Sequence, residues 1–365
     1  MLETGLSRMR VALIGPKAPP LGGMANQTRQ LAQLLASEGV SVFSVSVNPP
    51  YWPRWVGAVP ILRALFRMGP YLARLWKASG HCDVFHIMAN SGWSWHLFAA
   101  PAIWVAHSRG IAVVVNYRGG EADKFLQVSA PLVRFSLRRA RALVVPSLFL
   151  ESVFSRFGIA ACVVPNIIDL SLFYPRNARR ADPPHLLVAR NLEKLYDIDT
   201  ALRCFLLVLH KYPQARLTVA GSGPEEASLK HWVNTQGLTA SVCFTGPLEC
   251  GAMAALYRNA DLVLNPSLAD NMPNSLLEAW ASGVPVVSTN VGGIPCMVQD
   301  GVTASLVQPS DPNGMAQACI TLLCDDLLWQ ARAQAGLQAA QRYSWTCVRP
   351  QWAEVYRRSV FPSIS

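Results

Sequence analysis

The sequence predicts an α/β protein made of two halves, each a doubly wound parallel sheet with helices on both faces. Short apolar runs that resemble buried strands alternate with amphipathic stretches of helical period. A glycine-rich loop follows the first strand of the chain, and a second such loop follows a strand in the second half. The chain has 365 residues, 51% of them hydrophobic, which is enough for two domains with buried cores.

The first half begins with an apolar run at 9–14, which we interpret as a strand. The loop GPKAPPLGG comes next, followed by a helical stretch at 26–39 whose leucines share one face. Residues 40–47 alternate as a strand does. This order is typical of the first unit of a doubly wound sheet. Further buried strands are predicted at 83–88, 112–117 and 142–147.

The alternation restarts after an arginine- and proline-rich segment. The second half opens with a strand, a helix and a second strand that ends in GSGP, at 185–190, 199–212 and 215–221. We expect the two halves to face one another across a cleft, because ligands of such sheets bind at the carboxyl ends of the strands. The predicted segments are an N-terminal domain, a linker, a C-terminal domain and a final helix, at 1–175, 176–184, 185–345 and 346–365.

Several classes of protein are disfavoured by the composition. No apolar run reaches the roughly 20 residues that a membrane-spanning helix needs. The N-terminus lacks the basic and apolar pattern of a signal peptide. The nine cysteines include no CxxC pair, which favours reduced thiols over disulfides or a zinc site. We therefore expect a cytoplasmic protein without a metal centre.

Charge is distributed unevenly along the chain. Up to residue 180 there are 20 Lys and Arg against 7 Asp and Glu, or +13, and beyond it 12 against 15, or −3. The basic half predicts an anionic partner, which is a nucleic acid, a lipid surface or a phosphorylated substrate. A nucleic acid is disfavoured because no helix-turn-helix, zinc or RNA-binding signature accompanies the charge.

The stretch DNMPNSLLEAWASGVPVVSTNVGG at 270–293 carries the clearest functional signal. Asp270 lies on a predicted loop, and a helix is expected from Pro273 to Ser282. The first backbone N–H groups of such a helix have no partner within it and carry partial positive charge, which suits a diphosphate. Glu278 follows in the second turn. A ligand with hydroxyl groups on both sides of a diphosphate, as in a nucleotide sugar, would meet one acid on each side.

The segment 266–295 resembles the donor site of the retaining glycosyltransferases of family four, which have the GT-B fold. Further matching pieces occur in the family order: PPLGGMANQT, VVPNIIDLSLF, VARN, AGSGPEEASLK, FTGPL and RYSWTCV, at 19–28, 163–173, 188–191, 220–230, 244–248 and 342–348. Each piece is weak alone, and the ordered set covers essentially the whole chain. The resemblance implies a GT-B fold whose C-terminal helix packs back on the N-terminal domain.

The resemblance also implies roles for single residues. Glu278 would bind the ribose hydroxyls, Asp270 would contact the transferred sugar, and Arg190 would neutralise the diphosphate. The predicted catalytic residues are these three. The residues expected to bind the nucleotide sugar are Gly22, Gly23, Arg190, Lys194, Gly221, Gly223, Gly246, Leu248, Asn271, Met272, Pro273, Asn274, Ser275 and Glu278.

Three departures from the family pattern stand out. The first acid is Asp270 where the family has Glu. A lysine that usually follows the arginine is replaced by Tyr196, with Lys194 two residues away. The histidine that many members carry after the strand at 112–117 is absent, which leaves the acceptor side to nearby residues. The acceptor-side residues that we predict are His86, Arg118 and Glu121. For His86, which ends an apolar strand, a role in the core is the favoured alternative.

These observations predict a metal-independent enzyme that moves a sugar, with retention, from a UDP- or GDP-linked donor to a glycan or polyprenyl-linked acceptor. We expect its role to be in surface polysaccharide or glycolipid synthesis. Because of the two substitutions in the donor site, a degenerate scaffold without turnover is an alternative. A dinucleotide oxidoreductase is disfavoured, since neither half shows GxGxxG with a later acid.

The segment 51–78 combines three tryptophans with five basic residues and no acids. Such a segment can lie at an anionic membrane surface. It is equally consistent with amphipathic helices that pack on the core and turn their arginines to water. The net charge of the first half favours a peripheral contact on the inner face of the membrane.

Overall fold

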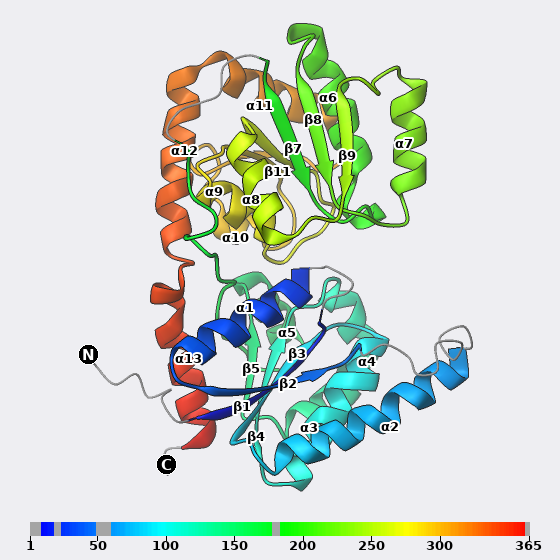
Figure 1. Ribbon diagram of the computed structural model, residues 1–365, viewed down its shortest axis with the longest axis vertical. Helices are drawn as coiled ribbons and strands as arrows, with labels where there is room; N and C mark the ends of the chain where they lie inside the picture. The colour runs from blue at the N-terminus through cyan, green and yellow to red at the C-terminus, as the bar shows by residue number, and fades with distance from the viewer. Residues whose placement is uncertain (1–8, 18–22, 49–59, 177–182, 362–365) are drawn as a thin grey trace. The chain divides into compact units, whose positions relative to one another are not determined.

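The computed structural model describes residues 9–17, 23–48, 60–176 and 183–361, with the side chains of 60–66 excluded. The chain divides into two compact units. Unit 1 consists of Met1–Pro165 and Val348–Ser365, and unit 2 of Asn166–Cys347. Figure 1 labels most of the elements of both units. Each contains a six-stranded sheet in which all recorded strand pairs are parallel.

The sheet of unit 1 has the order β2-β1-β3-β4-β5-β6. The chain places β2 on one side of β1 and then adds β3 to β6 on the other side, so the strand order reverses at β1. The central strands are buried on both faces, because helices cover a parallel sheet from both sides. The strands are Arg10–Gly15 (β1), Ser41–Ser46 (β2), Val84–Ala89 (β3), Ala112–Tyr117 (β4), Ala142–Val145 (β5) and Cys162–Val163 (β6).

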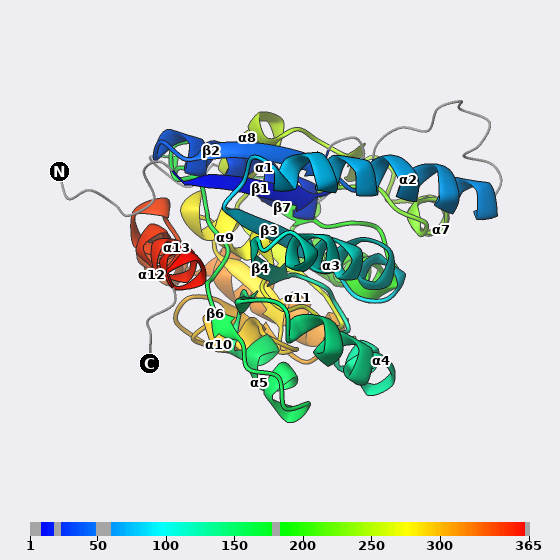
Figure 2. The same ribbon diagram turned by 90° about the horizontal axis from the view of Figure 1, so that it is seen from below.

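Helices of unit 1 pack on both faces of this sheet. On one face, α2 to α5 form the main core, and α3 lies between α2 and α4 (Figure 2). A π-helical turn, η2, leads into α3. The helices are Gly23–Ser37 (α1), Pro60–Ser79 (α2), Trp95–Ala99 (η2), Ala100–Ser108 (α3), Ala122–Leu137 (α4), Leu148–Arg156 (α5) and Trp345–Val360 (α13).

The final helix, α13, returns to the N-terminal unit. It buries Trp352 and Tyr356 completely, and the Trp352 ring lies 4.9 Å from the ring of His86 in β3. Arg349 also forms an ion pair of 3.1 Å with Glu38, which follows α1. The predicted C-terminal helix that packs back on the N-terminal domain is confirmed.

Unit 2 has the sheet order β12-β11-β10-β7-β8-β9. From β7 the chain adds β8 and β9 toward one edge of the sheet, and from β10 it adds β11 and β12 toward the other edge. Strands β7 and β10 are therefore neighbours at the switch point. The strands are His185–Ala189 (β7), Arg216–Ala220 (β8), Val242–Gly246 (β9), Leu262–Asn265 (β10), Val286–Thr289 (β11) and Ser305–Val307 (β12).

Two apolar cores sandwich the sheet of unit 2. One core is formed with α6, α7, α11 and the start of α12, and the other with α8, α9 and α10. A 3₁₀ turn, η3, lies between β7 and α6. The elements are Lys194–Tyr196 (η3), Ile198–Lys211 (α6), Glu226–Thr235 (α7), Cys250–Asn259 (α8), Asn274–Ala281 (α9), Ile294–Met297 (α10), Pro312–Cys324 (α11) and Asp326–Gln341 (α12).

The boundary between the units lies earlier than the predicted domain end at 175. Residues from Asn166 onward already pack in unit 2, where Ile168 and Phe173 are buried in the core beside α8 and α9. The Ile168 backbone N–H also donates to the Tyr343 carbonyl at 2.9 Å. Most of the predicted linker, 177–182, lies outside the described residues.

Candidate functional site

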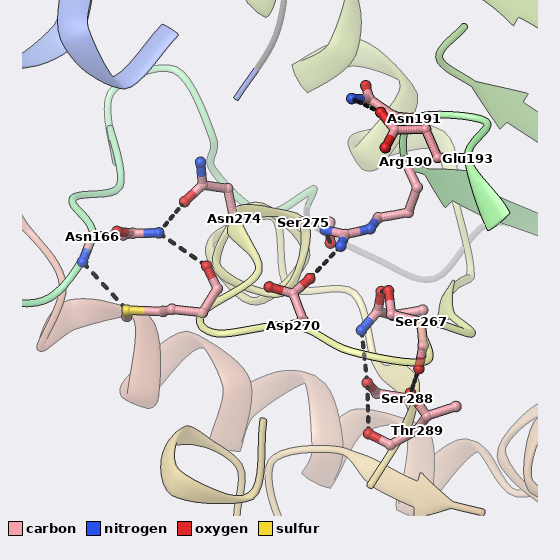
Figure 3. A network of polar contacts seen from close by, with 12 residues as sticks. Asn166, Arg190, Asn191, Glu193, Ser267, Asp270, Asn274, Ser275, Ser288 and Thr289 are labelled. Atoms are coloured by element: carbon pink, nitrogen blue, oxygen red, sulfur yellow. Dashed lines mark hydrogen bonds and ion pairs between the residues drawn. The ribbon is translucent and has the colours of Figure 1, made fainter. Parts of the chain in front are cut away.

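The carboxyl ends of β7 and β10 bring together two charged side chains that were predicted for the site. Arg190 follows β7, and its Nη2 forms an ion pair with the Asp270 carboxylate on the loop after β10 (Figure 3). Nη1 lies 3.5 Å from the hydroxyl of Ser275, in the first turn of α9. The side chains of the pair are only 10% and 13% exposed. A cation is therefore held beside the N-terminus of α9.

That helix terminus favours an anion. Pro273 is the N-cap residue and supplies no side-chain hydrogen bond to the first turn of α9. The first N–H groups of an α-helix have no acceptor within the helix, and the macrodipole places partial positive charge there. With Arg190 beside it, this terminus has the geometry and charge that bind a diphosphate.

Glu278 lies one turn further along α9. Part of the residue is accessible to solvent, yet protein atoms surround its carboxylate, and this burial raises its pKa to about 7. The Tyr257 side chain and the Arg190 cation oppose this shift. Tyr257 comes from α8, and its buried hydroxyl has no hydrogen bond of normal geometry within the described residues. Glu278 therefore titrates near neutral pH, and its carboxyl group suits the recognition of ligand hydroxyls.

A glycine pair supports the loop that carries Asp270. A Cβ on Gly293 would lie 1.9 Å from the Asn271 carbonyl oxygen, and a Cβ on Gly292 would lie 2.2 Å from that of Asp270. Gly292 also has a φ of +54°, a conformation that other residues rarely adopt. The Gly293 N–H donates to the Asp270 carbonyl at 2.8 Å. Any side chain at Gly293 would displace this loop.

Asn166 holds the far end of the same loop. Its side-chain amide donates to the Met272 carbonyl at 3.0 Å and to Asn274 Oδ1 at 2.7 Å, while its backbone N–H lies 3.3 Å from the Met272 sulfur. Beneath the loop lies a fully buried hydrogen-bonded network (Figure 3) formed by Asn265, Ser267, Ser288 and Thr289. The loop between β10 and α9 is thus fixed at both ends and from below.

The GSGP loop supports the segment that carries Arg190. A Cβ on Gly221 would lie 2.0 Å from the Arg190 carbonyl oxygen, and a Cβ on Gly223 would lie 2.3 Å from that of Leu192. The Gly221 N–H donates to the Gly246 carbonyl at 2.9 Å. Gly221 and Gly223 thus have a packing role, and contact of these two glycines and of Gly246 with a donor stays a prediction.

Four other predicted donor-site residues lie apart from these contacts or cannot be placed. Lys194 begins η3 and is exposed. Leu248 packs against the core beside α8 and α9. Gly23 is the first residue of α1, and Gly22 lies outside the described residues. Their roles stay predictions.

His86, which was predicted on the acceptor side, is a core residue of unit 1. Its Nδ1 lies 2.6 Å from the Tyr356 hydroxyl and its Nε2 lies 3.0 Å from Asn116 Nδ2. Asn116 Oδ1 accepts from Arg118 Nε at 2.8 Å, so Nδ2 is the donor to His86 and Nδ1 of His86 carries the proton. Burial, and then the charge of Arg118, lower the pKa of His86 to about 3. Because it is fully buried and both nitrogens are bonded, His86 cannot contact an acceptor directly.

Arg118 and Glu121 follow β4 at the carboxyl edge of the unit 1 sheet. Arg118 also donates to Gln27 Oε1 at 2.9 Å, and burial lowers its pKa to about 10. Glu121 is exposed, pairs with Lys124 at 2.5 Å and has a φ of 50°. Such a conformation is strained for a residue with a side chain. The acceptor roles of both residues stay predictions.

Three residues at the site had not been predicted to contribute to it. They are Tyr257 beside Glu278, Asn166 beneath the loop, and Tyr196, whose ring centroid lies 4.1 Å from the Arg190 guanidinium. Asn166 belongs to the run VVPNIIDLSLF, which is one of the segments that resemble the family pattern. Within the described residues, no group of three or more His, Cys, Asp and Glu side chains could hold a metal ion.

Comparison with known families matches both units. Residues 21–172 match the family described as Glycosyltransferase Family 4, and residues 183–325 match Glycosyl transferases group 1. The chain is 26% identical over 372 residues to phosphatidyl-myo-inositol mannosyltransferase of Mycolicibacterium smegmatis, covering 95% of this chain and 93% of that protein.

Solved structures share the fold. Sucrose-phosphate synthase from Thermosynechococcus elongatus superposes with a TM-score of 0.74 at 21% identity, covering 96% of this chain and 99% of the other. HepE from Anabaena, solved in complex with UDP and glucose, gives a TM-score of 0.72 at 16% identity, over 96% and 99% of the two chains. The predicted GT-B fold is confirmed.

The close approach at Gly293 predicts a large effect of one added methyl group. We expect Gly293→Ala to lower the free energy of unfolding by about 1–3 kcal/mol, because its Cβ would overlap the Asn271 carbonyl. Gly251→Ala is the control, since nothing lies within 4 Å of its Cβ. Urea denaturation measures both. Equal stability of the two variants would contradict the packing role of Gly293.

The raised pKa of Glu278 predicts a pH dependence of stability. In the folded state the carboxyl binds its proton up to about pH 7, whereas its ordinary value is 4.5. The folded state therefore holds more protons between these values, so this group's contribution to stability falls as pH rises. Glu278→Gln should gain stability relative to the wild type between about pH 4.5 and 7. Denaturation curves over that range measure it, and a constant difference would refute the shift.

Proposed function

Because the chain belongs to the glycosyltransferases of family four, we propose that it transfers a sugar from a nucleoside-diphosphate sugar to a hydroxyl of a glycan or lipid-linked acceptor. The observation that carries the proposal is the arrangement around α9. A helix N-terminus and Arg190 converge, with Asp270 before them and the buried carboxyl of Glu278 after them. A nucleotide sugar has hydroxyls on both sides of its diphosphate and suits this order of groups.

The chemistry that this site supports is stabilisation of a leaving nucleoside diphosphate. When the bond between the sugar and the phosphate breaks, negative charge builds on the diphosphate. Arg190 and the first N–H groups of α9 are fixed donors for that charge, and preorganised donors of this kind lower the barrier. Glu278 would anchor the ribose, and Asp270 the transferred sugar. We propose that the reaction needs no metal and retains configuration, with attack on the face that the diphosphate leaves.

Uracil and guanine nucleotides are the proposed donors. HepE, which has the same fold, was solved with UDP, and this favours UDP as the first candidate. The mannosyltransferase relative acts on a lipid, according to its name, and this favours a lipid-linked acceptor. We propose that the reaction takes place at the cytoplasmic face of a membrane, in surface polysaccharide or glycolipid synthesis.

We expect substitution of the charged donor-site residues to lower the rate of sugar transfer or the affinity for the donor. Arg190→Ala should lower kcat by about 10²–10³-fold, because a fixed donor to the leaving group is lost. Glu278→Gln should raise the donor KM by about 10–100-fold, because the ribose hydroxyls lose a charged hydrogen-bond acceptor. Transfer and hydrolysis are measured with a panel of UDP- and GDP-sugars. Arg203→Ala is the control, since Arg203 is an exposed arginine paired with Asp199 on α6. Wild-type activity in both site variants would refute the proposal.

We also propose that unit 1 binds an anionic membrane surface through α2. Of the predicted segment 51–78, residues 51–59 lie outside the described residues. In the described part of α2, Tyr71 and Leu75 are buried in the core, whereas Leu72 and Trp76 are 39% and 53% exposed. Arg74 and Lys77 of this helix are exposed, and Arg109, at the end of α3, lies 4.6 Å from the Trp76 ring. The helix thus packs on the core and also presents a basic, aromatic face, which suits a membrane interface. No helix among the described residues is long and apolar enough to span a membrane.

Vesicle flotation tests this contact. We expect the protein to float with vesicles that contain phosphatidylglycerol, and less with pure phosphatidylcholine. Trp76→Ala should lower the partition coefficient about tenfold, because the indole leaves the interface. Trp93→Ala is the matched control, as Trp93 is 78% exposed elsewhere in unit 1. Absence of flotation at low salt, or equal losses in the two variants, would refute the proposal.

A further inference from the structure

Tyr196 occupies the place where the sequence pattern led us to expect a second cation. It closes η3, the short turn between β7 and α6. The Leu268 backbone N–H donates to the Leu195 carbonyl at 2.8 Å, which ties this turn to the loop that carries Asp270. Tyr196 is therefore held beside the charged groups of the site by the backbone.

The ring of Tyr196 lies against the guanidinium of Arg190. Arg190 Cζ is 4.1 Å from the ring centroid, while Nη2 pairs with Asp270 and Nη1 lies 3.5 Å from the Ser275 hydroxyl. Arg190 Nε is buried and has no hydrogen-bond partner within the described residues. The guanidinium is thus contacted on one face by a ring and at its edge by a carboxylate and a hydroxyl.

These contacts restrict different motions of one side chain. Asp270 fixes the end of the guanidinium through an ion pair, and the Tyr196 ring, which faces the guanidinium carbon, restricts its movement on that side. Stacking on an aromatic ring is a property of arginine that lysine's compact ammonium does not share in this form. A cation whose movement is already restricted loses little freedom when it binds an anion.

The Tyr196 side chain is neutral at the pH of the site, as the direction of its pKa shift indicates. Burial raises the pKa of the Tyr196 hydroxyl above its ordinary value, and the charge of Arg190 only partly opposes this. Tyr196 therefore adds no charge to the site at neutral pH. The positive charge beside Asp270 and the first turn of α9 comes from Arg190.

We propose that Tyr196 is a positioning residue for the donor diphosphate. It holds the Arg190 guanidinium beside the N-terminus of α9, so that the site uses one oriented cation where the family pattern has two. Asp270 is the counter-charge that completes this clamp, which gives the shorter acid a role in addition to sugar recognition. The inference rests on the proposed binding of a nucleoside diphosphate at this terminus.

Calorimetric titration with UDP and with GDP, each alone, tests the inference. Tyr196→Phe keeps the ring and should bind within about twofold of the wild type. Tyr196→Leu and Tyr196→Gln remove the ring and should weaken binding about five- to thirty-fold. The same Leu change made in an Arg190→Lys background should have little further effect, because the ring acts through the guanidinium.

A matched control lies in the same unit. Tyr174→Leu removes a ring that lies 4.4 Å from the Arg258 guanidinium, away from Asp270, and it should leave binding unchanged. Thermal melting of every variant separates loss of binding from loss of folding. Undiminished binding in both ring-less variants, a Phe variant as weak as the Leu variant, or full additivity with Arg190→Lys would overturn the role of Tyr196. If the wild type bound neither UDP nor GDP, the proposed function would fail first, and this inference with it.

Discussion

The adjacency of β7 and β10 is the constraint on which the candidate site depends. The two strands are neighbours in the sheet of unit 2 because the chain first winds outward through β8 and β9 and then crosses back. This switch point brings Arg190 and Asp270 together from distant parts of the sequence. Loops at such a point diverge to opposite sides and leave room for a ligand at the carboxyl edge. The ion pair is therefore a consequence of strand order, and it holds Arg190 beside the N-terminus of α9.

The loops that carry the charged side chains are held in place by glycines and by the uncharged side chain of Asn166. Gly292 and Gly293 allow the loop of Asp270 to lie against the start of α10, and Gly221 does the same for the segment of Arg190. Asn166 closes the loop from the other side. Groups that stabilise developing charge are effective when they need not reorganise. The glycines of the sequence motif carry no charge, but they fix the loops that position the charged residues.

Much of the fold could be predicted because buried parallel strands are short apolar runs and because each half repeats the same order. The acids of the site were also visible, since Asp270 and Glu278 flank a recognisable helix start. What could not be predicted depends on contacts between distant segments. A single sequence does not show that the Tyr196 ring lies under Arg190, or that the Tyr257 hydroxyl lies near Glu278. The start of unit 2 at Asn166 could not be predicted for the same reason, because the partners of Asn166 lie in the segment 272–274.

His86 shows most clearly how a distant segment changes the meaning of a residue. From the strand alone it was expected near an acceptor, yet α13, more than 250 residues later, covers it with Tyr356 and Trp352. The proton on Nδ1 then faces Tyr356, and Nε2 accepts from Asn116, which in turn holds Arg118. A histidine buried in this way and kept neutral is a structural link. The C-terminal helix therefore helps to set the position of Arg118 at the carboxyl edge of unit 1, where the fold class places its ligand.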